Sequence, residues 1–166
     1  MYDLVFKELL GINYAITQKA SEPNLMINYS LNSLLPGICV KPNGLLNEDS
    51  IDAKWSTKIT FETWNSLPIF FKNETSGIPF DIFSAIFYCV SRYEEYLDFE
   101  KDIHKRFTAE NSFLLKYDVL HLPIVNQWVI ALLKELQKHY KDLKFQPRKF
   151  QYVSTIDIDQ AWKFKH

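Results

Sequence analysis

The most strongly patterned part of the sequence is the stretch PFDIFSAIFYCV, residues 79–90. Apolar side chains return at helical spacing through Phe83, Ile86 and Val90, and further apolar residues cover the other sides. A helix that is apolar around most of its circumference packs against several neighbours. The pattern therefore predicts a central buried helix over residues 80–98, whose second half turns polar.

A second helix is predicted over residues 122–140. Pro123 lies near its first turn, where the missing N–H costs nothing. Val129, Leu132 and Leu136 belong to an apolar stripe along one side of the helix. The sequence thus supplies two main helices, each with a face that needs to be buried.

Shorter elements are indicated around these helices by alternating apolar residues and by turn-forming residues. We expect an opening helix at 2–10 and strands at 12–17, 24–29, 38–40, 59–64, 67–71 and 149–159. The spacing favours two hairpins, the first from 12–17 and 24–29 and the second from 59–64 and 67–71. The predicted fold is α+β: a mostly antiparallel or mixed sheet, formed by the early and final strands and packed by the two main helices.

The composition indicates one ordered core in a chain of 166 residues, of which 47% are hydrophobic. A net charge of −1 without a basic stripe argues against a nucleic-acid partner. The N-terminus lacks the features of a signal peptide, and no apolar run approaches the roughly 20 residues that span a bilayer. We expect no membrane contact and a cytoplasmic location. Cys39 and Cys89 are too few for a disulfide scaffold and are expected to be small core residues.

The last predicted strand places two carboxylates on one face. Side chains alternate along a strand, so Asp157 and Asp159 point to the same side. Two neighbouring carboxylates at a strand end favour a cation, hydrogen-bond donors or water, and a divalent metal is the most specific of these. The alternative is a strand that ends in solvent, with Asp159 capping the following turn.

The segment STIDID, residues 154–159, resembles the first motif of the NodB-type polysaccharide deacetylases. Residues 79–83, 91–97 and 106–112 are similar to segments of the uncharacterised N-terminal domain that precedes the deacetylase barrel in a group of bacterial proteins. This second resemblance covers residues 1–150 and is the more specific of the two. It implies an accessory domain at 1–150 and the first strand of a truncated deacetylase domain at 151–166.

The resemblance also implies roles for the two aspartates. Asp157 matches the catalytic base, and Asp159 matches the aspartate that binds the metal, usually zinc. The family's two aspartates are adjacent, whereas Ile158 separates them here, so either one could be the ligand. The family further needs two histidines at a spacing that this sequence does not contain. The implied function is a non-catalytic accessory domain with an incomplete deacetylase site, which binds no cofactor by itself and whose partner is the missing barrel or another polysaccharide enzyme.

Four charged residues are candidates for an interdomain surface: Arg92, Glu95, Arg106 and Glu110. Arg92 and Glu95 are spaced as i, i+3 partners on a helix, and an ordinary surface ion pair is the favoured interpretation. Two other functions stay open. The chain could be a carbohydrate-binding or protein-interaction module of a surface-polysaccharide pathway that uses its aromatic residues, although core packing is the better use of the tryptophans. It could also be a small metal-dependent hydrolase in its own right.

Overall fold

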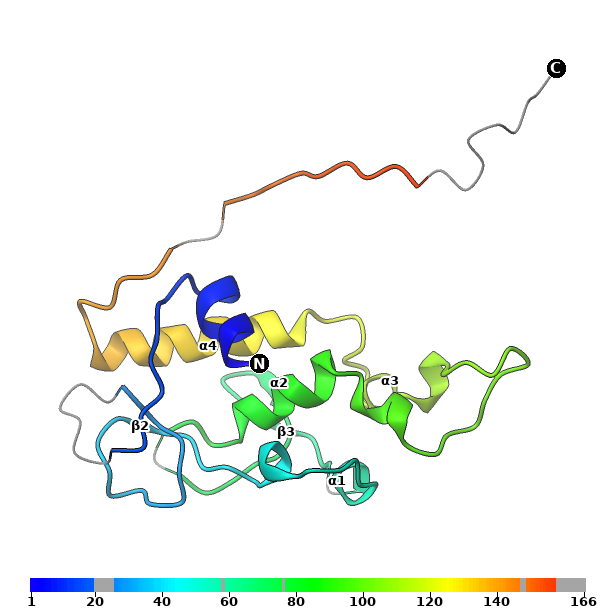
Figure 1. Cartoon of the computed structure of the whole chain (residues 1–166), viewed down its shortest axis with the longest axis horizontal. Helices are drawn as coiled ribbons and strands as arrows, with labels where there is room; N and C mark the ends of the chain where they lie inside the picture. Colours follow the sequence, from blue (N-terminus) through cyan, green and yellow to red (C-terminus); the bar gives the residue numbers. More distant parts are fainter. Residues whose placement is uncertain (20–25, 58, 76, 147–148, 158–166) are drawn as a thin grey trace.

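The computed structural model describes residues 1–19, 26–57, 59–75, 77–146 and 149–157, and shows an α+β fold (Figure 1). Two helices form its centre, α2 (Ile82–Val90) and α4 (Ile124–His139). Shorter helices surround them: η1 (Leu4–Leu9), η2 (Leu45–Asn47), α1 (Lys54–Thr57), η3 (Tyr93–Tyr96), η4 (Ala109–Asn111) and α3 (Phe113–Lys116). No helix within the described ranges is long and apolar enough to cross a membrane.

Helix α2 is buried as predicted, but it is shorter than the predicted helix. It begins after Asp81, whose carboxylate accepts a hydrogen bond from the backbone N–H of Ser84. It ends at Val90 because Arg92 adopts a left-handed conformation with φ 54°, which an α-helix does not tolerate. The chain then continues as the separate 3₁₀ turn η3, so the prediction of one helix to residue 98 was wrong.

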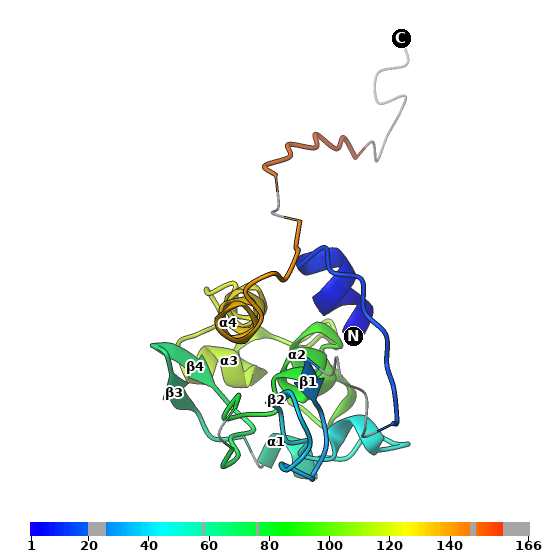
Figure 2. The same ribbon diagram turned by 90° about the vertical axis from the view of Figure 1, so that its left-hand side faces the viewer.

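Helix α4 agrees closely with its prediction and packs its apolar face against the core. Val129, Leu132 and Leu136 are buried against the rest of the body. Trp128 is also fully buried, and its indole N–H donates to the carbonyl oxygen of Pro68 at 2.8 Å. Figure 2 looks along α4 and shows the β3–β4 hairpin to one side of it and η1 to the other.

The strands form two separate two-stranded sheets instead of one central sheet. The second predicted hairpin is confirmed: β3 (Glu62–Trp64) pairs antiparallel with β4 (Leu67–Ile69). The first is wrong, because β1 (Ile27–Asn28) pairs in parallel with β2 (Ile38–Cys39). Residues 12–19 form no strand with any other described residue. The same holds for 149–157, so the predicted final strand has no partner in this structure; residues 158 and 159 lie outside the described ranges.

Aromatic side chains fill the core between the two central helices. Phe70 contacts Trp128 with ring centroids 5.5 Å apart, and Tyr88 at 6.0 Å. Edge-to-face contacts of this kind add about 0.5–1.5 kcal/mol each beyond the burial of area. Cys39 is buried and Cys89 largely so, and both are free thiols, as their apolar neighbours in the sequence predicted.

Candidate functional site

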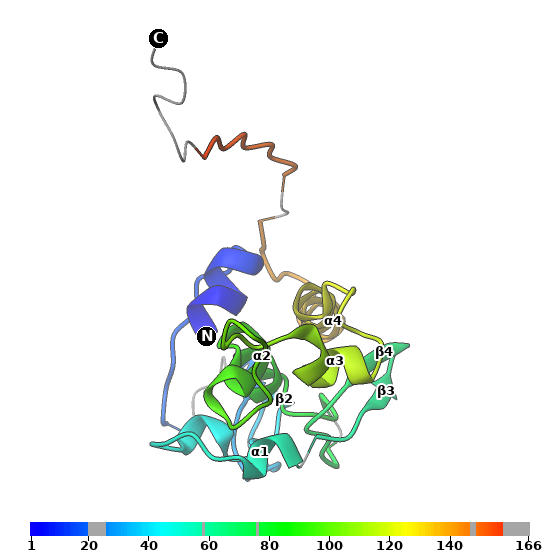
Figure 3. The same cartoon turned by 90° about the vertical axis from the view of Figure 1, so that its right-hand side faces the viewer.

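The predicted deacetylase motif lies on a segment that leaves the folded body. Figures 1 and 3 show residues 149–157 as an extended chain that points away from every helix and sheet. Three of its large side chains are almost fully exposed: Phe150 at 94%, Tyr152 at 82% and Ile156 at 83%. Asp157 is exposed as well, and Asp159 lies outside the described residues.

The structure does not bring further metal ligands to Asp157. Among the described residues, no group of three or more His, Cys, Asp or Glu side chains lies close enough to hold a metal ion. A catalytic zinc takes three protein ligands and a water molecule. The donor set of the described chain therefore does not fit a catalytic zinc by itself, and one exposed carboxylate is its contribution.

The four candidates for an interdomain surface contribute to two separate ion pairs and to one short 3₁₀ turn. Arg92 pairs with Glu95, and Arg106 pairs with Asp102 at 2.8 Å. Glu110 lies on η4, where a hydrogen bond from the Thr108 hydroxyl lowers the pKa of its carboxyl. Each of these contacts is local in sequence. Exposed pairs of this kind contribute little to stability, because water and salt screen their charges.

A buried carboxylate that the sequence did not single out organises the centre of the fold. Asp81 has no exposed surface and receives four hydrogen bonds. Its oxygens accept from the Ser84 N–H at 3.0 Å, the Ser84 hydroxyl at 2.6 Å, the Tyr29 hydroxyl at 3.0 Å and the Asn43 N–H at 2.8 Å. Asp81 thus joins the start of α2 to two loops far away in sequence.

Asp81 also affects the pKa of two neighbouring tyrosines, Tyr2 and Tyr29. Burial raises the pKa of Tyr2 to about 12, and the nearby carboxylate of Asp81 adds to this effect. Burial likewise raises the pKa of Tyr29, again with a contribution from Asp81. Both phenols therefore stay neutral, and the Tyr29 hydroxyl donates a hydrogen bond to Asp81. The sequence did carry a signal for this site, since Asp81 stands just before the apolar periodicity begins and Ser84 follows three positions later.

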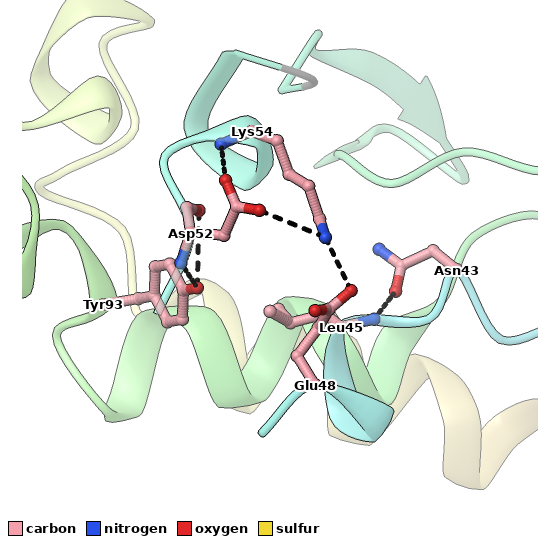
Figure 4. A network of polar contacts seen from close by, with 6 residues as sticks. All are labelled: Asn43, Leu45, Glu48, Asp52, Lys54 and Tyr93. Atoms are coloured by element: carbon pink, nitrogen blue, oxygen red, sulfur yellow. Dashed lines mark hydrogen bonds and ion pairs between the residues drawn. The ribbon is translucent and has the colours of Figure 1, made fainter. Parts of the chain in front are cut away.

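A second polar network holds the loop between η2 and α1 (Figure 4). Lys54 bridges two carboxylates, with its ammonium 2.8 Å from Glu48 and 3.2 Å from Asp52. The hydrogen bond to Glu48 is the largest cause of the raised pKa of Lys54. The Tyr93 hydroxyl accepts from the backbone N–H of Asp52 at 2.9 Å, which ties this loop to η3. The network explains how an irregular stretch keeps a defined shape.

A small polar cavity of about 430 Å³ opens beside this loop. Phe71, on its wall, adopts a left-handed conformation with φ 57°, which is rare for a bulky residue. The Asn43 side-chain nitrogen and the Asn73 side-chain oxygen are buried and have no hydrogen-bond partner among the described residues. The lining residues are Asn43, Trp55, Thr60, Glu62, Phe71, Lys72, Asn73 and Glu74.

A larger apolar groove of about 830 Å³ lies at the other end of the body. Its walls come from η1, from the extended segment 12–19, from β1 with the residues after it, and from the two central helices. Tyr2, Phe6 and Phe83 contribute its aromatic surface. A groove of this size and character is typical of a docking site for apolar side chains.

The three tryptophans within the described residues pack in or against the core. Trp55 and Trp128 are buried, and Trp64 is partly buried against the core with its ring 5.8 Å from that of Phe80. The expectation of core packing is confirmed for these three residues. Trp162 lies outside the described residues.

In a comparison with known families, residues 1–141 match the model of a family of unknown function (DUF7033). The matched region ends two residues after α4, before the exposed segment begins. Comparisons with curated proteins and with solved structures give no match.

Proposed function

Because the chain belongs to this family of unknown function, we propose its role from its own structure: a non-catalytic accessory domain of a polysaccharide deacetylase-like protein. The observation that supports the proposal is the exposed segment 149–157. It follows a well-packed body, alternates apolar and polar residues, and ends in the deacetylase-like motif.

The exposed side chains of this segment favour a partner sheet. Side chains an even number of residues apart point to the same face of a strand. A strand through this segment would therefore place Phe150, Tyr152 and Ile156 together on one face. Burial of each side chain would stabilise the strand by roughly 1.5–3 kcal/mol. A neighbouring β-structure that covers this face would therefore hold the segment firmly. We assign that neighbour to a deacetylase domain of the same polypeptide.

The assignment gives the two aspartates distinct tasks. Asp157 would accept a proton from the attacking water, and Asp159 would supply one ligand to a divalent metal such as zinc. Bound zinc would lower the pKa of that water and polarise the acetyl carbonyl. The remaining ligands would come from the deacetylase domain. The folded body of this chain contributes position and stability to the assembly and takes no part in the chemistry.

The test is a polypeptide that continues in frame beyond His166. We expect about one tightly bound zinc per chain and release of acetate from N-acetylated or O-acetylated sugar polymers. Asp159→Asn should lower both zinc content and activity, while Asp157→Asn should lower activity more than zinc content. Asp142→Asn, at an exposed position just after α4, is the matched control and should behave as the unchanged protein. A reading frame that closes soon after His166, or a longer protein that neither binds zinc nor releases acetate, contradicts the proposal.

The polar cavity favours a second candidate function, the binding of a carbohydrate. Asn43 and Asn73 each have one amide atom without a hydrogen-bond partner among the described residues, and a sugar hydroxyl can both donate and accept hydrogen bonds. Trp55 lines the same cavity and provides a fluorescence signal. Titration with a broad set of glycans should change this fluorescence, and Asn73→Ala should weaken the change, whereas exposed Asn126→Ala should leave it intact. No response from any glycan excludes this candidate.

A further inference from the structure

We propose that the apolar groove between residues 12–19 and β1 is the surface on which the domain that begins at about residue 151 docks. This inference rests on the proposed function, because it needs a domain in that position. It differs from the expectation that Arg92, Glu95, Arg106 and Glu110 form the interdomain surface. Three features of the structure support the groove: where the chain leaves the body, how short the connection is, and what the groove presents.

The chain leaves the body at the rim of the groove. Leu143 lines the groove, and three residues later the Gln146 N–H donates to the carbonyl oxygen of Leu10 at 3.2 Å. Gly11 packs so tightly against this point that an added Cβ would lie 2.6 Å from the Cβ of Gln146. Its φ of 62° is also a conformation that glycine adopts readily. The exit point is therefore held against the turn that ends η1.

The connection from this anchor to the exposed segment is short. Four Cα–Cα steps separate Gln146 from Phe150, and consecutive Cα atoms are about 3.8 Å apart, so the first strand of the next domain begins within about 15 Å of the anchor. A domain of about 200 residues has a radius of gyration of about 16 Å. A body of that size cannot begin so near the exit without contacting the surface around it, and the groove is part of that surface.

The groove offers both apolar surface and free main-chain groups. Ile16 lines it and is 70% exposed, which leaves a large apolar side chain without cover. Residues 13–19 form no backbone–backbone hydrogen bond within the described chain. The carbonyl oxygens of Met26 and Asn28 accept from the N–H groups of Ile38 and Val40, so the peptide groups of Ile27 between them point away from β2. An extended apolar segment of the partner domain, added as a strand, would cover the exposed apolar side chain and pair with these main-chain groups.

The charged candidates lie elsewhere. In Figure 1 the chain leaves from the end of α4 beside the segment 12–19, whereas the region of η3, η4 and α3 lies at the opposite end of the long axis. Arg92 and Arg106 belong to that opposite region and are paired with their own neighbours. A short connection from Gln146 therefore favours the groove over that surface.

Hydrogen exchange tests the inference when it is compared between the 166-residue chain and the polypeptide that continues beyond it. Backbone amides of residues 13–19 and of Ile27 should exchange at least about tenfold more slowly in the longer protein, because docking adds main-chain hydrogen bonds to amides that form no backbone–backbone hydrogen bond among the described residues. Ile16→Asp should abolish this protection. Ile103→Asp is the control, since Ile103 is 93% exposed on the opposite region and should not affect exchange at the groove. Urea unfolding of both variants in the 166-residue chain verifies that the body stays folded.

The outcomes separate this inference from the proposed function. If the longer protein binds zinc and releases acetate while residues 13–19 stay unprotected, the groove is not the interface and the function stands. If protection appears around Arg92 and Arg106 instead, the same conclusion holds and the charged surface is the interface. If no domain follows, or the following domain lacks zinc and activity, both the function and the docking surface are rejected.

Discussion

Replacement of Asp81 by alanine tests how far a single buried carboxylate determines this fold. The loss of the helix N-cap costs about 1 kcal/mol. The Asn43 N–H and the Tyr29 hydroxyl also lose their acceptor in a partly buried place, at about 1–3 kcal/mol each. The sum is about 3–7 kcal/mol, a large part of the 5–15 kcal/mol that typically separates folded from unfolded states.

Asp81→Asn should be milder and diagnostic. Its amide oxygen can still cap α2, and the hydroxyls of Tyr29 and Ser84 can reverse their hydrogen bonds to accept from the new NH₂ group. The Asn43 N–H cannot reverse and faces a donor, so we expect a loss of about 2 kcal/mol.

Urea unfolding followed by circular dichroism measures both variants. Asp49→Ala, at an exposed site, is the control and should change the free energy of unfolding by less than about 0.5 kcal/mol. A loss below about 1 kcal/mol for Asp81→Ala, or an equal loss for alanine and asparagine, refutes the role of Asp81 as a shared acceptor.

Three further predictions concern other parts of the body. Asn65 and Ser66 both have positive φ in the β3–β4 turn, so Ser66→Gly should raise the free energy of unfolding by about 0.5–1 kcal/mol, measured by urea unfolding, and a loss contradicts the turn assignment. Burial raises the pKa of Glu94 above its ordinary 4.5; the folded state therefore binds more protons in that range, and stability should fall as pH rises from about 4.5 through the raised pKa. Glu94→Gln should remove this slope in unfolding curves taken across pH, and an unchanged slope assigns it to another group. Burial also raises the pKa of the Cys89 thiol to about 12, so its alkylation at pH 8 should be about a thousandfold slower in the folded chain than in urea, and rapid labelling without urea contradicts the burial.

The sequence predicted the elements whose signals are local. Helix α4 has a continuous apolar stripe and a proline at its start, and both are properties of neighbouring residues. The β3–β4 hairpin has its turn residues between two short apolar runs. Tertiary contacts reinforce these preferences, so the predicted and observed elements agree.

The pairing of β1 with β2 could not be predicted in the same way. Hairpin signals favour strands that are adjacent in sequence, and residues 12–17 were the expected neighbour of β1. The parallel pairing depends on contacts over longer distances, including the isolated bridge between Val40 and Ile78 and the close approach of Gly77 to Cys39. An added Cβ at Gly77 would lie 2.2 Å from the carbonyl oxygen of Cys39, a constraint that sequence spacing does not reveal.

The sequence predicted candidate site residues only where they lie close together along the chain. Asp157 and Asp159 were singled out by their alternation, and their roles remain proposals. The groove and the cavity were missed because each is assembled from segments far apart in sequence, such as Tyr2, Phe83 and Leu143. Asp81 was readable as a helix cap, yet its bonds to Tyr29 and Asn43 depend on the folded arrangement.

The contact between Trp128 and Pro68 has a consequence for self-association. Thr63 and Pro68 form a pair that is not hydrogen-bonded across the hairpin, so the main-chain groups of Pro68 face outward from β4. At that position proline has no N–H to donate, and the indole of Trp128 already occupies its carbonyl oxygen. At Pro68 the outer edge of β4 therefore has neither a free N–H nor a free carbonyl oxygen, which disfavours the addition of a further strand there.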